Sequence, residues 1–127
     1  MKTNQEILDR LGNLIITDCF DKGINFVDQL RKNKTTPQIL KKEMDFVKSL
    51  TEDQVDGLKQ LIHRTQNNFL FNFLKIFEEY GDEYKIIYKE ENEEKNLVEI
   101  SEMLKAEHMI DGGWIERFSK YADDYEI

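Results

Sequence analysis

The clearest structural signal in the chain is TEDQVDGLKQLIHRTQNNFLFNFLKIFEEYG, residues 51–81. Thr51 and Gln54 match a capping box, in which two side chains satisfy free backbone amides at the start of a helix. Gly81 is typical of a helix C-terminus. At roughly 1.5 Å per residue the stretch predicts a helix about 45 Å long, over 51–80.

The apolar pattern of this helix changes along its length. Its first half is amphipathic, whereas its second half is apolar nearly all round and predicts burial on several sides. The first-half positions are Val55, Leu58, Leu61 and Ile62, and the second-half positions are Phe69, Leu70, Phe71, Phe73, Leu74, Ile76 and Phe77.

A second rod of similar length is expected at residues 4–32. Apolar residues recur there at steps of three and four, and their phase is kept across Gly23. The pattern favours one long helix that tolerates this glycine, and the alternative is two helices that meet at Gly23.

Shorter elements complete the expected fold. A break near residues 33–37 precedes a helix over 37–49, with Thr36 before Pro37, or Thr35 with Gln38, as its cap. Residues 84–98 suit a short β-hairpin or a loop. We expect helices over 99–110 and 114–122, then a frayed acidic tail. The sequence thus predicts one mainly α domain over 1–127, a bundle of four to five helices with a short hairpin near 84–98.

The negative charge is confined to one half of the chain. Residues 1–63 carry ten basic and ten acidic side chains, and residues 64–127 carry eight and sixteen, which gives the whole net charge of −8. Such a surface repels nucleic-acid phosphates and anionic lipid, so we expect neither nucleic acid nor membrane as a partner.

Targeting and redox features indicate a cytoplasmic protein. Residues 1–6 lack the apolar core of a signal peptide, and the apolar runs are too short to cross a bilayer. The only cysteine, Cys19, lies beside Ile16 and Phe20, which predicts a buried, unreactive thiol in a reducing compartment.

Few residues suggest a catalytic, metal-binding or cofactor-binding role. Gln60 and Lys105 stand three residues before the two histidines, so the Glu-x-x-His motif of di-iron bundles is absent. We expect no catalytic residue, no metal and no cofactor. The alternative is a small-molecule-binding or enzymatic bundle, with a polar pocket between the central helix and the C-terminal unit. Its residues would be His63, Asn67, His108 and Asp111.

The C-terminal half also carries a resemblance. Residues 96–101 (NLVEIS) followed by 111–121 (DGGWIERFSKY) resemble the C-terminal signature of a family of small, uncharacterised bacterial proteins. The resemblance covers roughly the second half of the chain and brings no catalytic residues. Acidic helical proteins of this size include toxin immunity proteins, an analogy of size and charge only.

Together these features favour a non-catalytic, cytoplasmic protein-binding module. An acidic run of Glu90, Glu91, Glu93 and Glu94 would steer a partner of basic or mixed charge, and Trp114 would be an aromatic anchor. An immunity- or antitoxin-like inhibitor is the most concrete form of this expectation. Homodimerisation through exposed aromatic residues is a further alternative.

Overall fold

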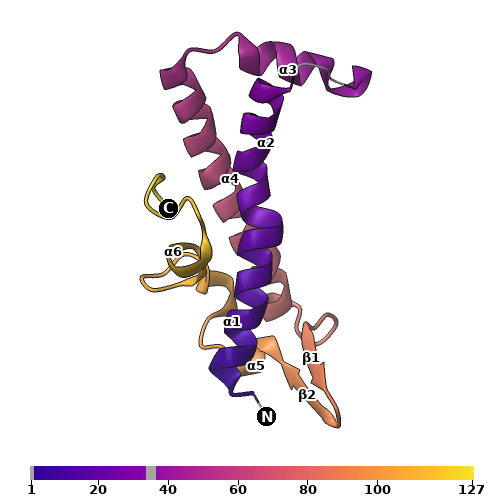
Figure 1. The fold of residues 1–127 in the computed structure, drawn as a ribbon. Coiled ribbons are helices and arrows are strands. Elements are labelled where there is room, and N and C mark those ends of the chain that lie inside the picture. The colour runs from indigo at the N-terminus through magenta and orange to yellow at the C-terminus, as the bar shows by residue number, and fades with distance from the viewer. Residues whose placement is uncertain (1, 34–36) are drawn as a thin grey trace.

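Two long helical rods cross in the computed structural model, which describes residues 2–33 and 37–127 (Figure 1). The first rod is built of α1 (Asn4–Ile15), a π-helical turn η1 (Ile16–Phe20) and α2 (Asp21–Lys32). The second rod is α4 (Glu52–Glu79). The expected mainly α fold with a short antiparallel hairpin is confirmed. The predicted caps at Thr35 and Thr36 lie outside the described residues.

The first rod is continuous, as predicted, and Gly23 lies inside α2. Its buried positions advance by four residues from Leu8 through Gly12 and Ile16 to Phe20. Each such step overshoots a turn of 3.6 residues by about 40°, and the wider π turn absorbs part of that drift. The same turn carries Cys19 to the surface, so the predicted buried thiol is wrong.

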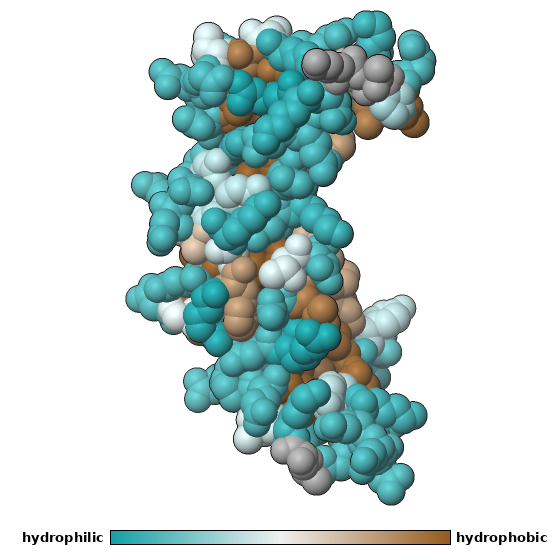
Figure 2. All heavy atoms as spheres, viewed as in Figure 1, coloured by the Kyte–Doolittle hydropathy of each residue, from teal (hydrophilic) through white to brown (hydrophobic). Residues whose placement is uncertain are grey.

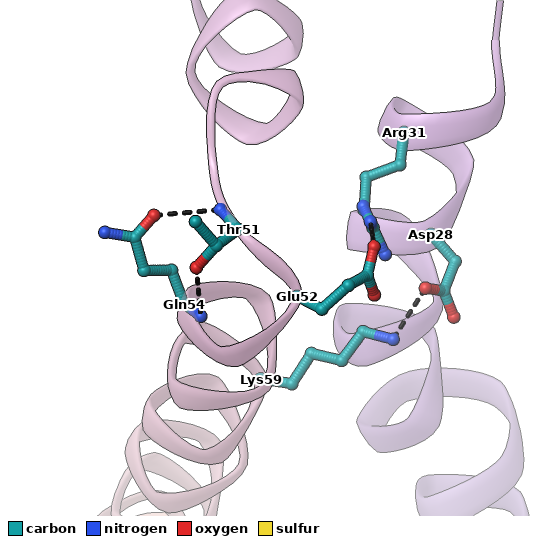
Figure 3. Close-up of polar contacts among 6 residues, drawn as sticks. All are labelled: Asp28, Arg31, Thr51, Glu52, Gln54 and Lys59. Carbon is teal, nitrogen blue, oxygen red and sulfur yellow. Dashed lines mark hydrogen bonds and ion pairs between the residues drawn. The ribbon is translucent and has the colours of Figure 1, made fainter.

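The N-terminal half of α4 is held against α2. The predicted capping box is present: Thr51 donates its backbone N–H to Gln54 Oε1 at 2.9 Å, and its Oγ1 accepts from the Gln54 amide at 3.2 Å (Figure 3). Lys59 then pairs with Asp28 at 2.6 Å across the two helices. Arg31, one turn after Asp28 on α2, forms a second ion pair with Glu52, the first residue of α4.

A short helix closes this end of the molecule. The 3₁₀ turn η2 (Gln38–Leu40) and α3 (Lys41–Lys48) confirm the predicted helix at 37–49. In Figure 1 α3 lies across the end of α2, and a short connection leads from α3 to the start of α4. A small apolar core joins the three helices, formed by Val27, Leu30, Val47 and Val55.

The larger core lies at the opposite end, where the first rod meets the C-terminal half of α4. Its buried side chains come from α1, η1, α4 and the C-terminal segments: Ile7, Leu8, Ile16, Phe20, Leu70, Leu74, Leu97, Leu104, Trp114 and Ile115. Trp114 packs directly over Gly12, where an added Cβ would stand 2.4 Å from the indole. The absence of a side chain at Gly12 therefore leaves the space that the indole ring of Trp114 occupies.

The hairpin projects from this end. Strands β1 (Ile87–Glu90) and β2 (Glu93–Asn96) pair antiparallel, which confirms the hairpin alternative for residues 84–98. Asn96 caps the next short helix, α5 (Leu97–Ile100), by accepting from the Val98 amide at 3.1 Å.

The predicted helix at 99–110 is wrong. α5 ends at Ile100, and the chain continues as bends, the 3₁₀ turn η3 (Leu104–Ala106) and further turns. Burial there alternates, with Leu104, Ala106 and His108 inside. The segment is fixed by α4, because Glu78 Oε1 accepts from the Lys105 amide at 3.1 Å. Contacts with α4 therefore override the helical periodicity of residues 99–110.

The C-terminus also differs from the prediction. Helix α6 spans Trp114–Phe118, shorter than the expected 114–122. Asp21 ends it by accepting from Ser119 Oγ at 2.5 Å and from the Lys120 amide at 2.9 Å. The tail is not frayed, since the side chain of Gln60 makes two hydrogen bonds with the backbone of Glu126.

Candidate functional site

The two histidines lie in the interior. His63, on α4, is fully buried, with its ring edge-on to Phe20 at 5.1 Å between centroids and 5.7 Å from the ring of Tyr125. Within the described chain neither ring nitrogen has a partner in hydrogen-bond geometry. Burial is the main cause that lowers the pKa of His63, and the nearby Glu126 backbone and Asp21 carboxylate oppose that shift only in part.

His108 reaches the same helix one turn further on. It is fully buried, and its Nε2 donates to the backbone carbonyl of Asn67 at 3.1 Å, which fixes the Nε2–H tautomer. Burial lowers the pKa of His108 to about 4, although this hydrogen bond opposes the shift. The folded protein then binds fewer protons than the unfolded chain as the pH falls from 6.5 to 4, so stability is lost across that window.

Three of the four residues of the predicted polar pocket are buried. His63 and Asn67 lie one turn apart on α4, and His108 bonds to the backbone of Asn67, whereas Asp111 is exposed. Three further buried polar atoms have no partner among the residues described: Asn67 Oδ1, His108 Nδ1 and the indole Nε1 of Trp114. Unpaired buried groups cost about 1–3 kcal/mol each unless a water or ligand satisfies them.

This interior does not have the donor set of a metal centre. Over residues 2–33 and 37–127 no group of three or more His, Cys, Asp or Glu side chains is arranged to hold a metal ion. Two neutral imidazoles and an amide can bind water or a small polar molecule, and they offer no nucleophile with an adjacent base. Trp114 is fully buried, so its ring does not reach the surface where a partner would bind.

The acidic run is displayed on the hairpin. Strand register sets Glu90 opposite Glu93, and the turn between them is Glu91-Asn92. Like charges directly opposite each other destabilise a hairpin. Glu91 also has a φ of 50°, a left-handed conformation that favours glycine or asparagine. The tip therefore concentrates carboxylates at a cost in local stability.

Some of these carboxylates already have partners. Glu90 Oε2 accepts from the Tyr88 hydroxyl at 2.9 Å, and Glu94 pairs with Lys89 at 3.5 Å across the strands. The surrounding segment, residues 82–102, holds eight acidic and three basic side chains. The hairpin end thus carries a net charge of −5, more than half of the total.

An apolar surface lies on the C-terminal half of α4. The prediction that the second half of α4 is buried on several sides is wrong, because four of its large side chains are open to solvent. We call them the α4 stripe: Phe69 (69% exposed), Phe73 (45%), Ile76 (42%) and Tyr80 (54%). Figure 2 shows hydrophobic side chains gathered over the lower half of α1 and α4.

The stripe exists because the two rods cross. Leu58 and Ile62 lie on the same face of α4 nearer its N-terminus, where they pack with α2 and α3. Beyond the crossing the same face of α4 loses that cover. A hollow of about 330 Å³ remains there, with Ile15 and Cys19 on one side and Phe69 and Phe73 on the other.

Sequence reasoning missed this surface, although a signal was present. Residues 65–74 (TQNNFLFNFL) contain no charged side chain, in a chain whose residues are 35% charged. A charge-free run that includes exposed positions indicates a surface adapted to contact rather than to solvent. The anchoring role of Asp21 was also missed, and no local pattern in the sequence predicts its contact with Ser119.

No protein-family model, curated protein or solved structure matches this chain. The resemblance of residues 96–121 to a bacterial family therefore stays a prediction. No described helix combines the length and the apolar character needed to cross a membrane.

Proposed function

We propose that this protein is a non-catalytic binding module whose acidic hairpin recognises a partner protein of basic or mixed charge. The observation that carries the proposal is the hairpin tip, where Glu90 and Glu93 face each other and Glu91 occupies a strained turn. Retaining glutamates where they repel each other and strain the backbone suggests selection for binding rather than for folding.

The negative charge of the hairpin end also supports recognition of a basic partner. A cationic surface placed against the tip would relieve the repulsion between Glu90 and Glu93 and would be drawn in from a distance by the net charge of −5. The solvent-facing Glu91 stands at the point of the turn, where a partner would meet it first. Phosphate-bearing partners are disfavoured by the same field.

The most specific form of the proposal is an immunity- or antitoxin-like inhibitor in the cytoplasm. It is supported by the acidic, mainly helical character of this chain of 15.2 kDa. This form predicts that the captured partner is toxic when expressed alone and harmless when it is co-expressed with this protein.

Affinity capture tests the proposal. The tagged protein is used as bait in lysate of the cell that encodes it, and the captured partner is then titrated against purified protein at several salt concentrations. The test variant carries glutamine at four positions: Glu90, Glu91, Glu93 and Glu94. We expect affinity to fall by about tenfold or more and the salt dependence to become shallower.

A matched control removes the same charge elsewhere. Amide substitutions at four exposed acidic positions in the net-neutral half change the net charge equally, at Asp18, Glu43, Asp53 and Asp56. This control should keep the partner affinity of the native protein. Equal affinity for the native protein and the hairpin variant would show that the acidic run only aids solubility, and the proposal would fail.

A second candidate function is binding of a small polar molecule. It is favoured by the unpaired buried atoms of His63, Asn67 and His108. Native mass spectrometry of protein purified without refolding would show a bound mass above 15.2 kDa. A single peak at the mass of the chain would remove this candidate and leave buried water to satisfy the cluster.

A further inference from the structure

We infer that the α4 stripe binds a second copy of this chain, with the two α4 helices antiparallel. This surface is separate from the acidic hairpin tip. Its members are the exposed Phe69, Phe73, Ile76 and Tyr80.

The spacing of the stripe fits helix-to-helix contact. Its residues are separated by four, three and four positions, the repeat by which two helices pack along a common seam. A two-fold axis between Phe73 and Ile76 places Phe69 of each copy against Tyr80 of the other. Such an interface is isologous, so the same patch serves both copies.

The three aromatic side chains of the stripe supply somewhat under half of the area that one partner contributes to a standard interface. An aromatic side chain presents roughly 200 Å² when fully exposed, so Phe69, Phe73 and Tyr80 together leave about 340 Å² open. A standard interface buries about 800 Å² from each partner. Ile76 and the polar residues that border the stripe, such as Asn68 and Asn72, add to this area.

The hollow beside the stripe gives the second copy an anchor point. It has a volume of about 330 Å³ and apolar walls that include Ile15 and Phe69. In the antiparallel arrangement the second copy's Tyr80 lies next to this hollow and can insert its ring. Aromatic side chains seated in pockets typically supply most of the affinity of an interface.

Charge selects a second copy over a basic partner at this surface. Residues 65–74, which carry Phe69 and Phe73, offer no carboxylate for a cationic partner to pair with, and beside Ile76 the carboxylate of Glu79 is already paired with Lys75. Two chains of net charge −8 repel each other least along such a face. The antiparallel direction also separates the acidic ends, because Asp82, Glu83 and the hairpin of one copy then lie toward the net-neutral half of the other.

Sedimentation equilibrium of the full chain over about 1 to 200 μM tests the inference. We expect a species of twice 15.2 kDa. Phe69→Glu should weaken the dimer at least thirtyfold or so, since a buried aromatic anchor is lost. Leu61→Glu is the matched control, because Leu61 lies on the same helix, is 61% exposed and stands outside the stripe. It should leave the dimer intact.

A charge pair tests the direction of the helices. Phe69→Lys and Tyr80→Glu should each weaken self-association, and an equimolar mixture of the two variants should restore a dimer, because Lys at 69 then faces Glu at 80. Restoration by mixing Phe69→Lys with Phe69→Glu instead would indicate parallel helices and would overturn the proposed arrangement. Circular dichroism checks that each variant is folded.

Two other outcomes would overturn the inference. One is a native protein that stays at 15.2 kDa over the whole concentration range. If that monomer sedimented with phosphatidylcholine vesicles and Phe69→Glu did not, the α4 stripe would be a lipid-binding surface. The other is a dimer that Phe69→Glu leaves unchanged. The hairpin glutamine variant should still dimerise, and Phe69→Glu should still bind the partner protein, so the two proposals fail separately.

Discussion

Replacing Gly23 with alanine should destabilise the protein, although alanine is the better helix former. The side-chain amide of Gln66 lies directly over Gly23, where an added Cβ would stand 1.7 Å from its Oε1. From that position Gln66 Nε2 donates to the backbone carbonyl of Phe20 at 2.8 Å. The alanine methyl group must displace the amide and break this bond between the two rods.

The magnitude follows from two opposing effects. Alanine in place of glycine inside a helix stabilises by about 1 kcal/mol. Loss of the partly buried hydrogen bond between Gln66 and Phe20 costs about 1–3 kcal/mol. In the native background Gly23→Ala should therefore lower the free energy of unfolding by up to about 2 kcal/mol. In a Gln66→Ala background no amide is displaced, and the same change should raise it by about 1 kcal/mol.

A double-mutant cycle measures this change of sign. Urea unfolding of the native protein, both single variants and the double variant, followed by circular dichroism, should give a coupling of about 1–3 kcal/mol between Gly23 and Gln66. Additive effects within about 0.5 kcal/mol would contradict this prediction, since they would mean that the amide does not occupy the space over Gly23.

Three further predictions concern stability. Gly12→Ala should lower the free energy of unfolding by about 2 kcal/mol because its methyl group meets Trp114, whereas Gly57→Ala, which meets nothing within 4 Å, should raise it by about 1 kcal/mol. His108→Gln should reduce the stability lost between pH 6.5 and 4, which amounts to about 3 kcal/mol for a pKa near 4, and unchanged pH dependence in urea titrations would contradict the cause given. Glu91→Gly should raise the melting temperature by relieving the φ of 50°, with a gain of about 1 kcal/mol, and a lower melting temperature would show that the turn is not strained.

Local signals in the sequence predicted the elements whose stabilising contacts are also local. The capping box at Thr51 and Gln54 places the start of α4, and the regular apolar steps from residue 4 to residue 32 predict a continuous rod. A capping box satisfies amides within one helical turn, so it can be recognised without knowing the fold.

The errors fall where distant contacts override such patterns. Residues 101–110 have helical periodicity, yet Glu78 draws the Lys105 backbone out of a helix. The end of α6 depends on Asp21, which lies 98 residues away from Ser119 in the sequence. The candidate residues show the same division, since His63 and Asn67 share one helix, whereas the contact between His108 and the Asn67 backbone joins residues 41 positions apart.

Helical periodicity, capping and charge count are properties of neighbouring residues, so the sequence predicted the two rods and the location of the negative charge, while residues 84–98 stayed open between a hairpin and a loop. Which apolar side chains are covered depends instead on how distant elements pack. Phe69 and Leu70 are adjacent and equally apolar, but one is 69% exposed and the other is buried. The crossing of the rods makes that difference, since α2 packs on α4 at only one end and leaves the α4 stripe open at the other.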